Sequence, residues 1–589
     1  MELIKLIGGI FIIIIPGYLW SFLFFKQLTI IERVIFGFVI SLIVLTCGVF
    51  AVEIIFNFSI TQTIILLLYT AYTIPVIILL ILSIKRFGRP KIPKKEDIFN
   101  KKNLLLIFIL SFVFFIVFIP HLKNGYFLPF HVDEWIHWSY TRELIESAST
   151  SFVNPYTGIG VTQSQEVGFH LMTTNIHFLS NSSLITMFLF LPSIFMVFTS
   201  LTVFNLGQRA ECPFGLEAAF LVAFIPTTCR FLGPSFYVPV GIGLLFLVFI
   251  LWLGQIKKIQ SIILLPLLIF FLFIMHPPTA LAGLILVMVY SLWLLFEKKY
   301  LLAIMSGGFS IIPVIAVLIL ATRWKYGLND VINAVFGTSY DLWLPKIWTS
   351  FDYLGLITWI FFVIGVYFCF SKGKTIQRTI GFSSIIIIIS IGIYDKLGYG
   401  VPIFYERAFM YLYLLVALAA AIGLSEFRNT LPEIIGRYKN IKIKNFSKYI
   451  MWGIPIFVAI ILLLTAFPAH LDIQYYEMIN EGEYEKFTWI HDNIDMYRNE
   501  THKFYKAAVA PFKASPFSAI TGLYIISSSM HPLYGYNLHQ KMSEFLNNGC
   551  INTSFIDKYE ISVVYTTSCN NENLTPIYPN VYLYPGLYE

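Results

Sequence analysis

Long apolar runs recur along most of the chain, and no other feature limits its fold as strongly. A helix needs about 20 predominantly apolar residues to cross the ~30 Å hydrocarbon core of a bilayer. About fourteen runs approach that length, with ends uncertain by a few residues. They lie near 4–25, 33–57, 62–84, 103–120, 184–206, 214–229, 237–254, 261–275, 279–296, 301–321, 353–370, 377–393, 403–424 and 449–467. Only 12% of the residues are charged, against about 25% in soluble domains, so the sequence predicts a polytopic α-helical membrane protein.

The distribution of Lys and Arg predicts which ends of these spans share a side. The linker 85–102 is strongly basic, and cytoplasmic loops carry an excess of Lys and Arg. Counting spans from this linker puts four further basic clusters on the same side: Lys257-Lys258, Lys298-Lys299, Lys372/Lys374/Arg378 and 428–448. The same count puts 121–183, 322–352, 394–402 and 468–589 at the outer face of the plasma membrane. The net charge of +7 is small and dispersed, so we expect no nucleic-acid partner.

The tail after about His470 changes character. Strand-like runs at 504–510, 523–528, 561–566 and 581–584 alternate with helical patterns at 484–494 and 538–547, which is typical of a small α/β domain. Cys550 and Cys569 share this region, where one disulfide can form if the region faces an oxidising compartment.

These features divide the chain into four parts. We expect an N-terminal three-span module (1–84), a basic cytoplasmic linker (85–102), a transmembrane domain (103–467) with the outer loop 121–183, and an extracytoplasmic α/β domain (468–589). The first run contains Pro16-Gly17 and no small-residue cleavage site, so we expect it to span the membrane rather than to be a removable signal peptide.

The stretch His131-Val132-Asp133-Glu134-Trp135-Ile136-His137-Trp138 is the leading candidate for chemistry. It follows an apolar run directly, and acids at that depth lose hydration unless they are paired or used. One interpretation is a reactive carboxylate that faces a cavity at the membrane surface. The other is a helix start, with Asp133 as the N-cap and Glu134 in the first turn, both favoured by the helix dipole. The two roles are compatible because a capping Asp keeps a second oxygen.

A second polar group follows in the same loop. Glu166, His170 and His177 recur at helical spacing and would share one face. Zinc binding by these three is geometrically conceivable, but a polar face that lines a cavity above the membrane is favoured. His276 precedes two prolines and reads most simply as a helix stop, with contact to an anionic group as the alternative.

Four cations are predicted near the outer surface, against the usual bias of Lys and Arg towards the cytoplasm. Arg323 and Lys325 open the loop 322–352, Arg230 closes the span before Gly233-Pro234, and Arg407 follows Tyr405-Glu406. Pairing with nearby carboxylates is one explanation. Phosphate binding is the other, because the planar guanidinium suits that ligand, and for Arg407 we favour it.

Motifs for nucleotide-driven chemistry are missing from the sequence: there is no P-loop, no HExxH, no GxSxG elbow and no dinucleotide fingerprint. The compartment at the outer face normally lacks ATP and nucleotide sugars. An enzyme that acts there would therefore need a donor that is bound to the membrane and already activated.

With this order of features the chain resembles the GT-C-fold glycosyltransferases that use polyprenyl-phosphate sugars. That group includes protein O-mannosyltransferases, aminoarabinose transferases and the catalytic subunits of oligosaccharyltransferases. The resemblance covers roughly 103–589, and the span pattern before it is similar to a module of archaeal membrane proteins, which points to an archaeal source. It rests on the following segments, in this order: Asp133-Glu134, Gly168-Phe169-His170, Tyr405-Glu406-Arg407, 561–565 and 581–584.

The resemblance implies an activity and roles for residues. The activity is an inverting hexosyl- or pentosyltransferase reaction from a polyprenyl (dolichyl) phosphate sugar to a hydroxyl of a glycan, lipid or protein. Asp133 would be the general base and Glu134 would orient the acceptor or a metal; a divalent metal is left open because metal dependence varies across the fold. The predicted phosphate ligands are Arg407, Arg230, Arg323 and Lys325, and the predicted cavity residues are His131, His137, Glu166, His170, His276 and Tyr405.

Two other classes of protein stay open at this point. A flippase or transporter for a lipid-linked sugar would show buried charges at mid-membrane and internal repeats; the nearest acids, Glu53 and Glu217, lie towards span ends. A non-catalytic subunit of a glycosylation complex is the third interpretation.

Overall fold

The computed structural model divides the chain into two compact units. It describes residues 1–87, 100–163, 166–228, 231–323, 353–398, 402–438, 443–473, 475–497, 506–529 and 536–584. The larger unit, here called the membrane unit, comprises Met1–Ala51, Gln62–Phe127 and Asn175–Gln474. The smaller, here called the loop unit, comprises Val52–Thr61, Leu128–Thr174 and Tyr475–Glu589. The first outer loop therefore folds together with the C-terminal segment, while the domain boundaries drawn at 84, 102 and 467 stay predictions.

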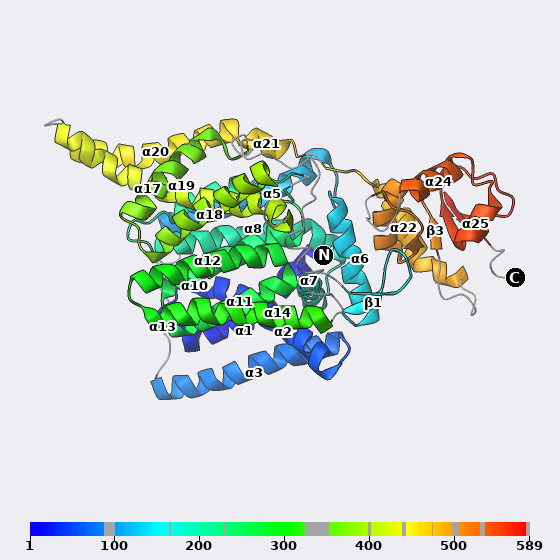
Figure 1. The fold of residues 1–589 in the computed structure, drawn as a ribbon, viewed down its shortest axis with the longest axis horizontal. Helices are drawn as coiled ribbons and strands as arrows, with labels where there is room; N and C mark the ends of the chain where they lie inside the picture. Colours follow the sequence, from blue (N-terminus) through cyan, green and yellow to red (C-terminus); the bar gives the residue numbers. More distant parts are fainter. Residues whose placement is uncertain are drawn as a thin grey trace. The chain divides into compact units, whose positions relative to one another are not determined.

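Apolar helices form the membrane unit (Figure 1). Within the described residues, nine helices are long and apolar enough to span a membrane, and five shorter apolar helices accompany them. They coincide one for one with the predicted runs and confirm the polytopic helical fold. One of the shorter segments runs from α13 into α14, and a further short helix, α21, follows the last segment. The helices are α1 (Glu2–Phe24), α2 (Ile30–Phe56), α3 (Gln62–Phe87), α5 (Lys101–Asn124), α8 (Leu184–Gln208), α9 (Gly215–Leu221), α10 (Pro239–Ile256), α11 (Ile259–Met275), α12 (Pro277–Phe296), α13 (Tyr300–Ala303), α14 (Phe309–Arg323), α17 (Leu356–Ser371), α18 (Thr375–Leu397), α19 (Pro402–Tyr438), α20 (Ile443–Thr465) and α21 (Phe467–Leu471).

Helices α10 and α19 form the centre of the membrane unit. Their most apolar windows are 94% and 100% buried, whereas that of α3 is only 17% buried. A helix that is apolar all round is stable only when neighbours or lipid cover every face. Close packing of α17 on α19 depends on glycine, because a Cβ at Gly365 would lie 1.8 Å from the carbonyl oxygen of Ala419. Small residues of this kind allow helix backbones to approach in membranes.

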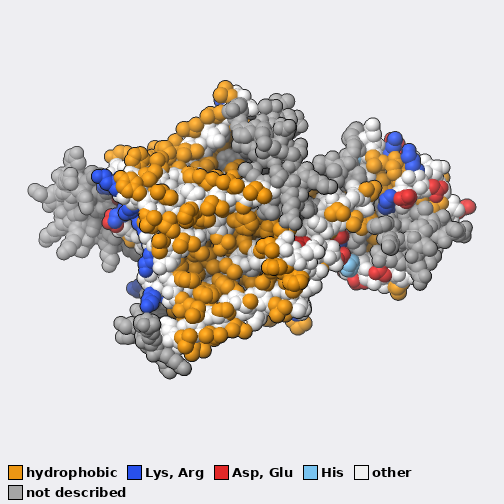
Figure 2. Space-filling model, turned by 60° about the horizontal axis from the view of Figure 1, so that its bottom comes forward, with side chains coloured by type: hydrophobic (Ala, Val, Ile, Leu, Met, Phe, Trp, Pro, Cys, Tyr) orange, Lys and Arg blue, Asp and Glu red, His pale blue; other side chains and the backbone are white. Residues whose placement is uncertain are grey.

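The turns at one end of the membrane unit are joined by Lys contacts. Lys258 Nζ lies 2.7 Å from Gln27 Oε1, and Lys257 Nζ lies 2.7 Å from Thr375 Oγ1 and 3.4 Å from Glu297 Oε2. These contacts bring together the α1–α2, α10–α11, α12–α13 and α17–α18 connections, as the positive-inside count predicts. Figure 2 shows Lys and Arg side chains gathered at one end of a largely apolar face.

The opposite end of the membrane unit holds the other helix ends. The Ser183 N–H donates to Glu2 Oε2 at 2.9 Å, and Lys123 Nζ donates to the Leu471 carbonyl at 2.6 Å. The rings of Phe118, near the end of α5, and Phe190, near the beginning of α8, stack with centroids 5.1 Å apart. The beginnings of α1 and α8 and the end of α5 therefore lie together, away from the Lys-rich turns.

The Pro-Gly pattern of the first span has a packing role. A Cβ at Gly17 would lie 2.8 Å from the Gly37 carbonyl oxygen, so α1 and α2 touch backbone to backbone. The Gly17 N–H donates to Ser41 Oγ at 2.9 Å. Glu32, at the start of α2, pairs with Arg209 at the end of α8. The first two spans are thus packed onto the rest of the bundle.

The loop unit contains one mixed sheet in the order β4-β3-β5-β7-β6. Strand β3 runs parallel to β4 and β5, and the remaining pairs are antiparallel. A separate hairpin of β1 and β2 belongs to the first loop. The elements are α6 (Val132–Ser147), β1 (Ser151–Val153), β2 (Val161–Gln163), α22 (Glu481–Asn493), β3 (Lys506–Ala508), α23 (Ala514–Thr521), β4 (Tyr524–Ile525), α24 (Tyr536–Asn547), α25 (Thr553–Tyr559), β5 (Ile561–Tyr565), β6 (Thr575–Tyr578) and β7 (Val581–Leu583).

The four predicted strands of the tail are present as β3, β4, β5 and β7, so the α/β fold of this segment is confirmed. Strand β6 escaped the sequence analysis because it contains Pro576. Proline cannot donate to a sheet ladder and is tolerated on edge strands, and β6 is an edge strand here.

Candidate functional site

The N-cap of helix α6 is His131, two residues before the predicted N-cap Asp133. The His131 Nδ1 accepts the Asp133 N–H at 3.1 Å. Glu134 Oε2 accepts the N–H groups of Phe130 and His131 at 2.8 and 3.0 Å, and its side chain is buried. This reciprocal arrangement is a capping box with histidine in place of Ser or Thr. The expectation that Asp133 caps the helix is therefore wrong, because His131 and Glu134, three residues apart, already satisfy the first N–H groups.

Asp133 is left with its carboxylate at the surface of the helix start. Its side chain is 32% exposed, and its Oδ1 lies 3.8 Å from His131 Nδ1. That distance is too long for a hydrogen bond, and this nitrogen's lone pair already accepts a backbone N–H. The N-terminus of α6 favours a negative charge at this position. Asp133 is thus an accessible carboxylate in the first turn of a helix, a position from which a general base could reach a substrate.

His137 lies one turn after Asp133 and joins two groups of the predicted loop helix, α7 (Val167–Ser180). Its Nδ1 lies 3.0 Å from His170 Nε2, and its Nε2 lies 3.5 Å from Glu166 Oε2. Burial and the neighbouring His137 lower the pKa of His170 well below its ordinary value, so His170 is neutral at pH 7. A neutral His170 that donates from Nε2 leaves His137 Nε2–H directed at the Glu166 carboxylate.

The predicted zinc ligands do not assemble into a metal site. His177 Nδ1 contacts the Ser182 carbonyl at 2.8 Å, after the end of α7. Glu166 and His170 contact opposite nitrogens of the His137 ring, so the ring lies between them. The predicted ligands Glu166, His170 and His177 therefore do not converge on one ion in this arrangement. No group of three His, Cys, Asp or Glu residues in the described part of the chain is arranged to hold a metal.

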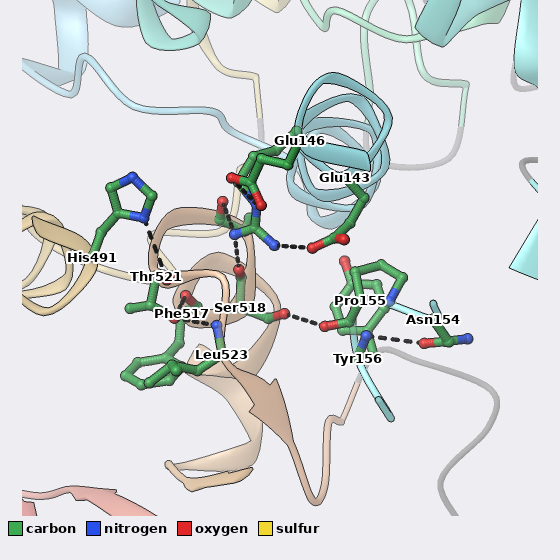
Figure 3. Close-up of polar contacts among 12 residues, drawn as sticks. Glu143, Glu146, Asn154, Pro155, Tyr156, His491, Phe517, Ser518, Thr521 and Leu523 are labelled. Carbon is green, nitrogen blue, oxygen red and sulfur yellow. Dashed lines mark hydrogen bonds and ion pairs between the residues drawn. The ribbon is translucent and has the colours of Figure 1, made fainter. Parts of the chain in front are cut away.

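Arg142 fixes helix α6 to the C-terminal segment of the loop unit. Figure 3 shows its partners Glu143, Glu146 and Ser518. Its guanidinium donates to the carbonyls of Ser518 and Ala519 at 2.6 and 2.9 Å, near the end of α23. It also pairs with Glu143 at 2.6 Å and Glu146 at 3.4 Å. Ser518 Oγ in turn donates to the Pro155 carbonyl at 2.8 Å. Sequence reasoning missed Arg142, since no local pattern relates it to residues far along the chain.

The predicted cations are described only in part. Arg230 and Lys325 lie outside the described residues, and Arg323 is described only as the last residue of α14. Arg407 is half-buried in the first turns of α19. Tyr405 is buried and stacks on Tyr394, with ring centroids 4.3 Å apart.

His276 anchors a buried network in the membrane unit. It sits between α11 and α12, and its Nδ1 lies 2.6 Å from Thr279 Oγ1. Thr279 Oγ1 lies 2.8 Å from the Tyr411 hydroxyl, one turn after Arg407 on α19. The helix-stop interpretation is confirmed, because α11 ends at Met275, and the Thr279 hydroxyl contacts the His276 ring. The sequence analysis did not identify Thr279 or Tyr411. The available signal was that Thr279 lies three residues after His276 and Tyr411 lies four residues after Arg407, which places each on the same helix face as its neighbour.

The helical bundle and the α/β segment together have the GT-C fold, as comparison with solved structures shows. No protein-family model and no curated protein sequence matches the chain. Solved structures of that fold do match.

The oligosaccharyltransferase of Archaeoglobus fulgidus in its apo form matches with a TM-score of 0.54 and 13% identity, over 80% of this chain and 69% of that chain. The same archaeal enzyme, AglB, in complex with an inhibitory peptide and a dolichol-phosphate, matches with a TM-score of 0.50 and 13% identity, over 78% and 69%. Its complex with Zn and sulfate gives 0.51 and 13%, over 79% and 68%. The chain is a polytopic membrane protein of the GT-C fold, as the resemblance predicts.

Proposed function

We propose that this protein is an inverting glycosyltransferase that moves a sugar from a polyprenyl (dolichyl) phosphate to an acceptor hydroxyl at the outer face of the plasma membrane. The observation that carries the proposal is the Asp133 carboxylate, which stands accessible at the start of α6 while His131 and Glu134 do the capping. Support for the donor comes from the fold, since a structural neighbour is a complex with a dolichol-phosphate.

In the proposed step the acceptor oxygen attacks the anomeric carbon of the sugar. A new C–O bond forms, the bond from the anomeric carbon to the phosphate oxygen breaks on the opposite side, and the configuration inverts. Asp133 takes the hydroxyl proton, and the polyprenyl phosphate leaves with the bonding electrons. An accessible carboxylate can pass that proton to water directly, so catalysis needs no further relay. Glu134 and His131 act as positioning residues, because their hydrogen bonds fix the first turn of α6.

The departing phosphate requires positive charge, which is the largest electrostatic demand of the reaction. We assign this role to Arg407, with Arg230, Arg323 and Lys325 as further candidates from the sequence. The network of His276, Thr279 and Tyr411 restrains α19 one turn from Arg407. Tyr405, two residues before Arg407, is assigned to the cavity. The acceptor side is assigned to His137, Glu166 and His170. The transferred sugar is proposed to be a hexosyl or pentosyl unit, and the acceptor a glycan, lipid or protein.

The test is transfer of a radiolabelled sugar from a synthetic polyprenyl phosphate by the purified protein, with a membrane-lipid extract as acceptor. Asp133→Asn should reduce the rate at least a hundredfold, the range typical for loss of a general base. Its matched control is Asp472→Asn, which changes a carboxylate that is 92% exposed and should leave the rate unchanged. Folded Asp133→Asn protein with full activity would contradict the proposal.

Arg407→Ala is tested in the same assay. Removing one charge that stabilises a developing anion typically costs a hundred- to a thousandfold in rate. Arg378→Ala is the control, because Arg378 lies at the Lys-rich end, over the ring of Trp293. Flux of a lipid-linked sugar across vesicles without product would instead identify a flippase, and activity only with a co-purifying partner would identify a subunit of a complex.

A further inference from the structure

Cys550 and Cys569 pack together in the loop unit, although they lie 19 positions apart in the sequence. Cys550 follows α24, and Cys569 lies in the connection between β5 and β6. Cys550 belongs to one apolar cluster of the loop unit, and Cys569 packs against the same cluster. Cys550 is fully buried and Cys569 is half-buried.

The backbone around the two cysteines is held in register by hydrogen bonds. The Asn570 N–H donates to the Gly549 carbonyl at 2.8 Å, and Asn571 Nδ2 donates to the Cys550 carbonyl at 2.7 Å. Asn570, which follows Cys569, is therefore hydrogen-bonded to Gly549, which precedes Cys550. These contacts bring the backbones on either side of the two cysteines together, and closeness of the two backbones is what a disulfide requires.

Cys550 also adopts a backbone conformation that cysteine rarely adopts. Its φ is +61°, in the left-handed region, and the preceding Gly549 has a φ of +70°. The left-handed region is unfavourable for an L-residue with a Cβ and favours Gly or Asn. A cysteine held there and buried beside a second cysteine indicates a use for the sulfur rather than filling of space.

We propose that Cys550 and Cys569 form a disulfide in the mature protein, and that the loop unit therefore faces an oxidising compartment. Disulfides of this structural kind persist outside the cytoplasm and are rare within it. The inference is independent of the proposed glycosyl transfer, because it concerns a covalent bond and the side of the membrane only.

The oxidation is balanced by thiol–disulfide exchange with an external disulfide. The half-buried Cys569 thiolate attacks one sulfur of that disulfide, which releases one thiol and leaves a mixed disulfide on Cys569. Cys550 then loses its proton and displaces the second thiol, and the Cys550–Cys569 bond forms. The two protein thiols lose two electrons and two protons, and the external disulfide becomes two thiols. Cys569 reacts first because it is the more accessible of the two.

The experiment is differential alkylation of the full chain purified from membranes without reductant. Denatured protein is treated with iodoacetamide, reduced, and then treated with N-ethylmaleimide before peptide mapping. Cys550 and Cys569 should carry only the second label, and a linked peptide should appear in the non-reduced digest. The thiols of Cys47, Cys212 and Cys369 serve as internal controls and should carry the first label. Iodoacetamide on both Cys550 and Cys569 would overturn the proposal.

Variants and a sidedness measurement complete the test. Cys569→Ser should move Cys550 into the first-label set, whereas the matched control Cys369→Ser should leave the linked peptide intact. In sealed right-side-out vesicles, a membrane-impermeant phosphine should reduce the bond. It should also raise the rate of tryptic cleavage after Lys558, within the cross-linked loop, by about tenfold or more. A bond that the impermeant reductant reaches only after the vesicles are opened would overturn the assignment of side.

Discussion

At the scale of single residues, the start of α6 separates two carboxylates that the sequence presents as a pair. Glu134 is buried in a capping box, while Asp133 keeps an accessible carboxylate one position earlier. The difference arises from the imidazole of His131, which takes the N-cap role and accepts the Asp133 N–H. The chemistry proposed for Asp133 therefore depends on a neighbour that performs the structural task in its place.

Replacing His131 tests this division of roles. His131→Ala removes the acceptor for the Asp133 N–H and should destabilise the protein by about 1 kcal/mol, as loss of an N-cap does. His131→Asn keeps an N-cap acceptor and should retain most of the stability. Thermal unfolding of the detergent-solubilised protein measures the difference, and equal midpoints for the two variants would contradict the capping role.

The burial of His170 predicts a pH dependence. Its pKa in the folded protein is depressed, while the unfolded chain takes up a proton at this side chain near pH 6.5. The unfolded state therefore binds more protons below that pH, and stability falls as the pH drops, by at most about 1.4 kcal/mol per pH unit for this group. Above pH 6.5 the group contributes no pH dependence.

The measurement is the unfolding midpoint of wild type and His170→Gln between pH 7 and pH 5. The Gln side chain can still donate towards His137, so the contact survives while the titrating group is lost. The midpoint should fall less steeply in the variant. His470, whose pKa is lowered to about 4 by burial, contributes equally to both proteins, so equal slopes would contradict the role of His170.

At the scale of elements, α1 and α2 depend on contact between their backbones. Gly17→Ala would place a Cβ 2.8 Å from the Gly37 carbonyl oxygen, and such overpacking costs typically 1–3 kcal/mol. The matched control is Gly8→Ala in the same helix, where nothing lies within 4 Å of the added carbon. Helix propensity should make that control neutral or slightly stabilising. The readout is the thermal midpoint, and a Gly17→Ala protein as stable as the control would disprove the close contact.

The attachment of α6 to α23 rests on Arg142. Arg142→Gln removes a buried guanidinium from two carbonyls and two carboxylates, and we expect a loss of about 2–4 kcal/mol. Glu146→Gln removes only the half-exposed partner, whose side chain is 49% exposed, and should cost less than about 1 kcal/mol. Hydrogen exchange of the α23 amides should rise in the first variant and not in the second. Unchanged exchange in Arg142→Gln would show that other contacts hold α23.

At the scale of the whole molecule, the two ends of the membrane unit should face different sides of the bilayer. Lys298→Cys and Lys374→Cys lie at the Lys-rich turns, and Asp472→Cys follows α21 at the other end. An impermeant maleimide added to sealed vesicles should label the first two from one side and the third from the opposite side, above the labelling of wild type. Labelling of all three from one side would refute the predicted sidedness.

The sequence by itself determined the elements of this protein and their order along the membrane. Hydropathy and Lys/Arg placement are local quantities, so they located the apolar helices and grouped their ends. Alternation likewise predicted four strands of the loop unit. The residue types within 131–138 also identified a helix start with carboxylates, because capping depends on residues a few positions apart.

Only the tertiary structure decided which distant groups meet. His137 contacts His170, Tyr411 completes the network of His276, and Arg142 caps a helix whose residues lie 376 and 377 positions further along. Such contacts leave no periodic trace in the sequence, because each depends on how whole helices pack and not on the residues between them. The role of His131 as the cap belongs to the same class: an imidazole can accept, donate or bind an ion, and its surroundings select which.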